Sequence, residues 1–135
     1  MTAGLRTIVV GYDGSDVARR ALGRAAEIVA EGARIVVLHA TPSADAAERE
    51  TADPAEEGHG AVLLEEAKAL LARRGRTPET RVALGDAAEQ LIAAATETNA
   101  DVIVVGRRRA PTAHVLGSVS AKVVEQAGCD VFVVR

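Results

Sequence analysis

The sequence predicts a doubly wound α/β fold, in which one parallel sheet carries helices on both of its faces. Five short runs rich in β-branched residues are separated by Ala- and Leu-rich stretches whose apolar residues follow helical spacing. The runs at 8–10, 35–38 and 102–105 are apolar at every position, as is typical of parallel strands covered on both sides. An antiparallel sandwich would show more alternation. Because crossovers between parallel strands are right-handed, this order of elements places helices on both faces.

The five predicted strands lie at 7–10, 34–38, 80–84, 101–105 and 130–134. Between the first two, Ser15 is expected to cap a helix that continues until Gly32 stops it. A second helix is expected over residues 61–74, before a glycine. Two further helices are expected to begin at Asp86 and at Ser118.

The domain organisation is expected to be simple. A chain of 135 residues can bury a core that needs no disulfide or metal. The segment 41–60 contains two prolines and mostly acidic charge, and we expect it to be a mobile, solvated excursion. Neither an internal repeat nor a low-complexity linker divides the chain, so we expect one domain over residues 1–135.

Composition disfavours several classes of protein. Sixteen basic against 19 acidic residues give a net charge of −3, and Tyr12 and Phe132 are the only aromatic residues. Such a chain lacks the basic surface and stacking rings of nucleic-acid binders. We expect neither a secretory signal nor a membrane span, because the first residues lack a basic region before an apolar run and no apolar stretch approaches roughly 18 residues. Cys129 is the single cysteine, so no internal disulfide can form and we expect a cytoplasmic protein.

Ligands of open α/β sheets bind beyond the carboxyl ends of the strands, so the segments 11–15 and 106–120 are the ones to inspect. Residues 106–122 contain three arginines and one lysine but no acid, a local charge of +4. The stretch Gly-Ser-Val-Ser at 117–120 begins a predicted helix, where free N–H groups favour an anion. An ordinary turn with Ser118 as N-cap, beside a solvated arginine loop, explains the same residues. Neither a Walker A nor a GxGxxG motif is present, which disfavours P-loop ATPases and Rossmann dehydrogenases.

Several of these stretches together carry a family resemblance. Residues 8–15 are Ile-Val-Val-Gly-Tyr-Asp-Gly-Ser, 36–40 are Val-Val-Leu-His-Ala, and 85–87 are Gly-Asp-Ala. With Val-Val-Gly at 104–106 and Gly-Ser-Val-Ser at 117–120, they make the chain resemble the universal stress protein family along nearly its whole length. The resemblance implies a Rossmann-like fold of the adenine-nucleotide alpha hydrolase type, with strand order 3-2-1-4-5.

The resemblance also implies a ligand, ATP or another adenine nucleotide, with a divalent cation such as Mg²⁺ on its phosphates. It implies that Asp13 contacts the adenosine portion and that Ala40 and Val105 flank the base. An aspartate at this position can instead simply organise the strand-to-helix turn. The residues implied to hold the nucleotide are Gly11, Tyr12, Asp13, Ala40, Val105, Gly106, Arg109, Gly117, Ser118, Val119 and Ser120.

One departure from the family pattern concerns the ligand loop. Nucleotide-binding members typically show Gly, two residues, Gly, nine residues, then Gly and Ser or Thr. Here Gly106 is followed after two residues by Arg109, and after seven more by Gly117. The arginine side chain either fills the pocket or donates a charge-assisted fork to a phosphate.

The last predicted strand is expected to lie at a sheet edge, which invites pairing with another chain. Family members often dimerise through this strand, so the resemblance implies a homodimer. Its interface residues would be Val131, Phe132, Val133 and Val134.

Three functions stay open: a homodimeric nucleotide-binding stress-response module, a dimeric interaction protein that does not bind nucleotide, and an adenine-nucleotide hydrolase or transferase. No general base is identifiable, so no catalytic residue is predicted, and no residue is predicted to bind a metal. His39 is expected to be a hydrogen-bonded structural residue, and His59 and His114 are expected in loops. Cys129 is expected to be a small apolar filler.

Overall fold

The computed structural model describes residues 4–41, 54–107 and 117–135. Its centre is a five-stranded sheet in the order β3-β2-β1-β4-β5, with every neighbouring pair parallel. The predicted fold class and strand order are therefore confirmed. The strands are β1 (Leu5–Gly11), β2 (Val29–Thr41), β3 (Glu79–Leu84), β4 (Val102–Gly106) and β5 (Asp130–Val134). The helices are α1 (Asp16–Ile28), α3 (Pro54–Ala72), α4 (Ala87–Thr98) and α5 (Ser118–Gln126).

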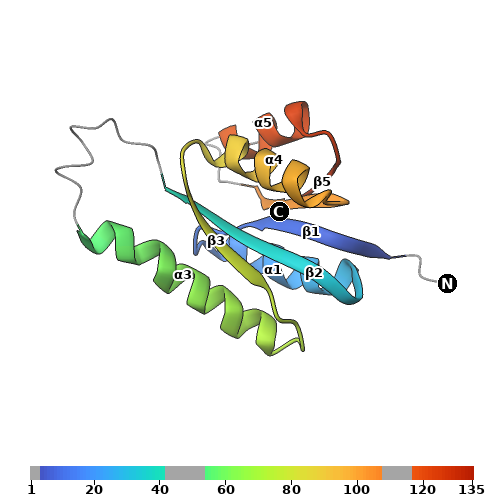
Figure 1. Cartoon of the computed structure of the whole chain (residues 1–135), viewed down its shortest axis with the longest axis horizontal. Coiled ribbons are helices and arrows are strands. Elements are labelled where there is room, and N and C mark those ends of the chain that lie inside the picture. The colour runs from blue at the N-terminus through green and yellow to red at the C-terminus, as the bar shows by residue number, and fades with distance from the viewer. Residues whose placement is uncertain (1–3, 42–53, 108–116) are drawn as a thin grey trace.

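The helices cover the two faces of the sheet in pairs. In Figure 1, α1 and α3 lie on one side of the strands, and α4 and α5 lie on the other. Ile8 and Val10 of β1 pack with α1 and α3, whereas Val9 between them packs with α4 and α5. This alternation explains why the central strands are apolar at every position, because both of their faces are buried.

Side-chain caps set the beginnings of two helices. The Ser15 hydroxyl accepts a hydrogen bond from the backbone N–H of Ala18, and the Asp86 carboxylate accepts one from Glu89. Both caps satisfy N–H groups that a helix leaves unpaired in its first turn. The predicted helix starts after Ser15 and Asp86 are therefore confirmed. No helix within the described ranges is long and apolar enough to cross a membrane.

Two predicted boundaries are wrong. The first helix ends at Ile28 rather than at Gly32, because Val29 pairs with Leu5 and already belongs to β2. The second helix begins at Pro54, within the expected excursion, so the expectation that His59 lies in a loop is also wrong. Proline suits the first turn of a helix, where its missing N–H costs nothing. Residues 42–53 lie outside the described ranges.

The helices that follow β1 and β4 lie on opposite faces of the sheet. The chain after β1 enters α1 on one face, and the chain after β4 leads to α5 on the other. Because β1 and β4 are neighbours while α1 and α5 lie on opposite faces, a space is left beyond the carboxyl ends of these strands. This is the point at which open α/β sheets bind ligands.

Candidate functional site

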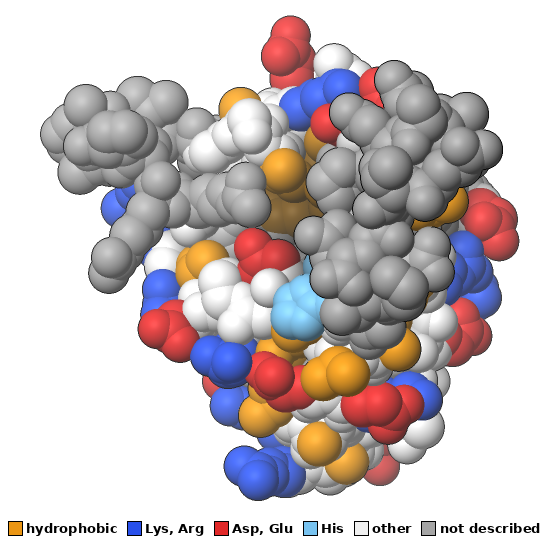
Figure 2. All heavy atoms as spheres, turned by 90° about the vertical axis from the view of Figure 1, so that its left-hand side faces the viewer, with side chains coloured by type: hydrophobic (Ala, Val, Ile, Leu, Met, Phe, Trp, Pro, Cys, Tyr) orange, Lys and Arg blue, Asp and Glu red, His pale blue; other side chains and the backbone are white. Residues whose placement is uncertain are grey.

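A cavity of about 890 Å³ opens at the carboxyl ends of β1, β2 and β4. Figure 2 looks onto this end of the sheet, where a histidine lies beside an acidic side chain and apolar side chains are recessed close by. The lining residues come from all three strands, from the segments that follow β1 and β3, and from α1, α3, α4 and α5. They are Gly11, Tyr12, Asp13, Ser15, Val17, Ala18, Leu38, His39, Ala40, Thr41, His59, Gly85, Asp86, Ala87, Leu91, Val105, Gly106, Val119 and Ser120.

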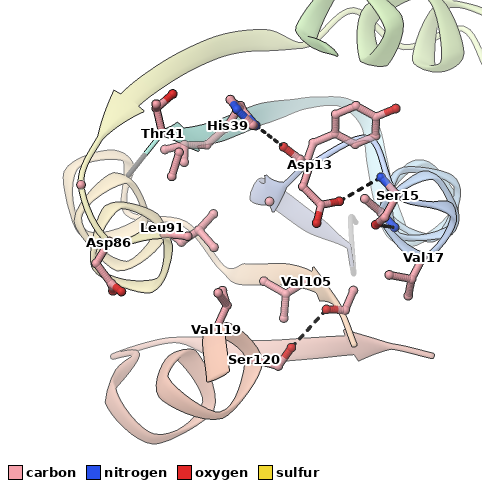
Figure 3. Close-up of a pocket in the computed structure, with 18 of the residues that line it drawn as sticks. Asp13, Ser15, Val17, His39, Thr41, Asp86, Leu91, Val105, Val119 and Ser120 are labelled. Carbon is pink, nitrogen blue, oxygen red and sulfur yellow. Dashed lines mark hydrogen bonds between the residues drawn. The ribbon is translucent and has the colours of Figure 1, made fainter. Parts of the chain in front are cut away.

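One wall of the cavity is apolar. Leu91, Val105 and Val119 come from three different elements and point toward a common space (Figure 3). Gly11 keeps that space open at the end of β1. A Cβ atom on Gly11 would lie 3.2 Å from Leu91 Cδ1 and 3.7 Å from Val105 Cγ1. The missing side chain therefore leaves room for a flat or aliphatic group between β2 and β4.

The end of β4 is held tightly between α1 and α5. The Ser120 hydroxyl donates a hydrogen bond of 3.1 Å to the Gly106 carbonyl, and Ser120 is buried. A Cβ atom on Gly106 would lie 2.9 Å from Val17 Cγ1. The glycine thus allows the start of α1 to approach the end of β4 at the cavity wall.

Asp13 organises the turn that follows β1. Its carboxylate accepts a hydrogen bond of 3.0 Å from the backbone N–H of Ser15, as Figure 3 shows. Asp13 is also exposed and lines the cavity. The turn-organising role is therefore confirmed, and a direct contact with a ligand remains a prediction.

Tyr12 lines the cavity, but its side chain packs in the core on the face of the sheet that α1 and α3 cover. Its hydroxyl donates to a Glu66 carboxylate oxygen, which also accepts from Arg19. Hydrogen bonds from Tyr12 and then from Arg19 lower the pKa of Glu66. Burial, followed by the Glu66 contacts, raises the pKa of Tyr12 to about 12. The side chain thus ties the loop after β1 to α3.

We expect Tyr12 to ionise near pH 12 in the folded protein, above the ordinary value of 10.0. The raised pKa favours the neutral phenol, so its stabilising contribution is present below pH 10 and is lost as the pH rises through about 12. Because the chain has one tyrosine and no tryptophan, phenolate absorbance reports this residue alone. Glu66→Gln should lower the midpoint, and Glu65→Gln, on the exposed side of α3, should not. Ionisation of wild-type Tyr12 at its ordinary pH would contradict the described hydrogen bond.

His39 lies at the end of β2, and His59 approaches it from α3. His39 Nδ1 lies 2.9 Å from the Tyr12 carbonyl oxygen, so its expected role as a hydrogen-bonded structural residue is confirmed. The two imidazole rings meet edge to face, with centroids 6.5 Å apart. Both histidines line the cavity.

Comparisons with known proteins agree with this architecture. The model of the universal stress protein family matches residues 4–135. The chain belongs to the universal stress protein family. A universal stress protein from Thermus aquaticus is 37% identical, over 96% of this chain and 98% of its own length.

Two solved structures of universal stress proteins contain a bound nucleotide. A universal stress protein in complex with cAMP is 30% identical, covers 98% of this chain and 99% of its own, and superimposes with a TM-score of 0.80. The universal stress protein from Archaeoglobus fulgidus in complex with dAMP is 25% identical, with coverages of 96% and 98% and a TM-score of 0.77. Adenine nucleotides are therefore ligands of relatives of this universal stress protein.

Most of the residues predicted for the site of this universal stress protein are brought together. Eight line the cavity: Gly11, Tyr12, Asp13, Ala40, Val105, Gly106, Val119 and Ser120. Gly117 and Ser118 lie at the start of α5, outside the lining. Gly117 is the N-cap of α5, so the alternative in which Ser118 caps that helix is wrong. Arg109 lies outside the described residues.

The sequence did not indicate the contributions of α3 and α4 to the site. His59 and Leu91 line the cavity from segments far from the motifs, and Asp86 lines it from the Gly-Asp-Ala stretch at 85–87. The only local signal was the Gly-Asp pair at 85–86, which follows a strand like the other ligand segments. Leu91 looks like any apolar residue of a helix, so only the packing of α4 reveals its position at the cavity.

The described lining of this universal stress protein carries two carboxylates, Asp13 and Asp86, and neither a lysine nor an arginine. Hydrogen bonds from Glu89 N–H, and then from Lys122, lower the pKa of Asp86. Lys122 Nζ lies 3.1 Å from Asp86 and 3.1 Å from Glu89, which links α5 to the start of α4. The lining therefore suits a ligand's hydroxyl and amino groups better than its phosphates.

Proposed function

We propose that this universal stress protein binds an adenine nucleotide, ATP in particular, in the cavity between β1 and β4. The observation that carries the proposal is the position of the cavity at the carboxyl ends of the neighbouring strands β1 and β4. Its size and its mixture of an apolar wall with a few polar groups suit a nucleotide-sized ligand. The cAMP and dAMP complexes of related proteins support the same ligand class.

The lining suggests how the parts of the nucleotide are oriented. Ala40 and Val105 would flank the base, and Asp13 would accept hydrogen bonds from the ribose hydroxyls. The phosphates would lie toward the start of α5, at Gly117, Ser118 and the residues that follow. The N-cap Gly117 has no side chain that could cap the first N–H groups of α5, and such N–H groups suit an anion.

A metal ion accompanying ATP would be Mg²⁺. Among the described residues, no group of three His, Cys, Asp or Glu side chains could hold a metal ion. Mg²⁺ would therefore be carried by phosphate oxygens, which it prefers. We further propose that the protein acts in the cytoplasm as a stress-response module that signals by binding, and we assign no catalytic residue.

The first test is mass spectrometry of small molecules released from the denatured protein, with calorimetric titration of ATP and AMP into the native one. Ala40→Leu should weaken binding by roughly 5- to 150-fold, because overfilling a packed site costs about 1–3 kcal/mol. The control is Ala83→Leu, since Ala83 pairs with Ala40 on the neighbouring strand but does not line the cavity.

Absence of released nucleotide and of binding up to millimolar ATP would refute the proposal. That outcome would favour the second candidate, a dimeric interaction protein in which Arg109 and the shortened loop exclude nucleotide. Equal losses in Ala40→Leu and Ala83→Leu would instead show that binding does not depend on this cavity.

We also propose that the protein is a homodimer formed through β5. This strand lies at an edge of the sheet, next to β4, and an edge strand presents unpaired backbone groups. Val131, Phe132 and Val133 of β5 are only partly buried within the single chain, whereas Val134 is buried. Pairing two β5 strands about a two-fold axis would cover this edge.

Val133→Pro should convert the dimer to a monomer in size-exclusion chromatography, because proline cannot donate a ladder hydrogen bond. Val82→Pro, in the opposite edge strand β3, is the matched control and should leave the dimer intact. Circular dichroism of both variants checks that the sheet is retained. A dimer that survives Val133→Pro with a native spectrum would rule out this interface.

A further inference from the structure

A pair of imidazoles marks one side of the cavity. His39 comes from β2 and His59 from α3, and both line the cavity in the part of the chain that the structure describes. The nucleotide assignment above uses neither residue. Two histidine rings from separate elements in a partly enclosed space form the simplest set of nitrogen ligands for a transition metal.

The hydrogen bond of His39 determines which of its nitrogens is available. The Tyr12 carbonyl can only accept, so the hydrogen of the neutral ring lies on Nδ1 and the lone pair lies on Nε2. Metal-binding histidines typically donate their other ring N–H to a carbonyl or carboxylate in this way, which fixes the orientation of the ring.

The approach of α3 to this ring is unusually close. A Cβ atom on Gly60 would lie 3.1 Å from His39 Cδ2 and 3.4 Å from Val82 Cγ2, and Gly60 is buried. Glycine at this position thus lets the helix turn that carries His59 lie against His39. The result is one fixed imidazole and one exposed imidazole side by side.

The ring centroids lie somewhat farther apart than coordination of one metal ion requires. Zn–N bonds of about 2.1 Å place two ring centroids roughly 5 Å apart at a tetrahedral angle and about 6.4 Å apart when linear. The observed separation is 6.5 Å. Because His59 is exposed, rotation of its side chain can bring the rings closer without moving the sheet.

We propose that His39 and His59 bind a divalent transition metal ion, with Zn²⁺, Cu²⁺ or Ni²⁺ as the suitable class. These ions favour imidazole nitrogen, whereas Mg²⁺ favours oxygen, so this site differs from that of a nucleotide-bound Mg²⁺. No third side chain among the described residues completes the ligand set. Water, or an oxygen of a molecule in the cavity, fills the remaining positions.

The test is calorimetric titration of Zn²⁺ into nucleotide-free protein without an affinity tag, with Mg²⁺ titrated separately. Zn²⁺ should bind at one site per chain, and Mg²⁺ should not. His59→Ala and His39→Asn should each weaken Zn²⁺ binding by at least about tenfold, since even outer-shell partners of metal ligands contribute about 10- to 100-fold. His39→Asn retains an N–H donor for the Tyr12 carbonyl, so the loop keeps its hydrogen bond.

His114→Ala and Cys129→Ser are the controls, because they remove the other histidine and the only thiol. Both should bind Zn²⁺ like the wild type. Absence of Zn²⁺ binding, or equal binding by the wild type and both pair variants, would overturn the proposal. Because the titration contains no nucleotide, it is independent of whether ATP binds. Loss of ATP binding with intact Zn²⁺ binding would affect only the proposed function.

Discussion

Leu71→Ala is expected to lower the free energy of unfolding by about 2–5 kcal/mol, the usual range for truncating a buried leucine. Leu71 has 0% exposure and packs from α3 into the core that α1 shares with the sheet. Truncation removes buried apolar surface and leaves a cavity that the neighbouring helix and strands can only partly fill. Urea denaturation followed by circular dichroism measures the loss, and the fluorescence of Tyr12 reports the same face of the sheet.

Val62→Ala in the same helix is the matched control, because Val62 is 65% exposed. Its expected change is within about 0.5 kcal/mol, as for most surface substitutions, and alanine is the better helix former. Equal stabilities of the two variants would mean that α3 does not pack on the sheet as described. In that case the position of His59 at the cavity would also be wrong, because His59 lies on the same helix.

Gly106→Ala is expected to cost about 1–3 kcal/mol of stability and to weaken nucleotide binding, because it overpacks the cavity wall. The new Cβ atom would lie 2.9 and 3.0 Å from the Val17 Cγ atoms and 3.1 Å from its backbone carbonyl carbon. A flexible side chain could move away, but the backbone of α1 cannot do so without shifting the helix start. Thermal or urea unfolding gives the stability change, and ATP calorimetry gives the change in affinity.

Gly128→Ala is the control, because nothing lies within 4 Å of the position its Cβ would take. A double variant with Val17→Ala should recover part of the lost stability, which isolates the side-chain share of the clash. The contact between the new Cβ atom and the Val17 backbone should persist in the double variant, so recovery should be incomplete. Equal stabilities of Gly106→Ala and Gly128→Ala would contradict the close approach of α1 to β4.

Local patterns were sufficient to predict most of the secondary structure. Ser15 and Asp86 cap helices from within their own segments, and continuous apolar runs mark buried strands wherever they occur. The end of α1 was predicted wrongly because Val29 is equally suited to a helix or a strand by spacing alone. Its pairing with Leu5 of β1 makes it part of β2, and that pairing depends on tertiary structure.

The residues of the candidate site likewise fall into those that the sequence could place and those that only tertiary structure places. Gly106 follows one apolar run directly and Asp13 follows another after two residues, so their positions at the carboxyl ends of parallel strands could be predicted from the sequence. That these two strands are neighbours was implied by the family resemblance and is confirmed by their pairing. Leu91 on α4 and His59 on α3 could not be placed, because their distance from β1 depends on how each helix packs across the sheet. The core position of the Tyr12 side chain likewise depends on Glu66, 54 residues away. Strand positions and helix caps follow from local chemistry. The strand order was implied only by the family resemblance, and the cavity walls arise from packing between distant segments.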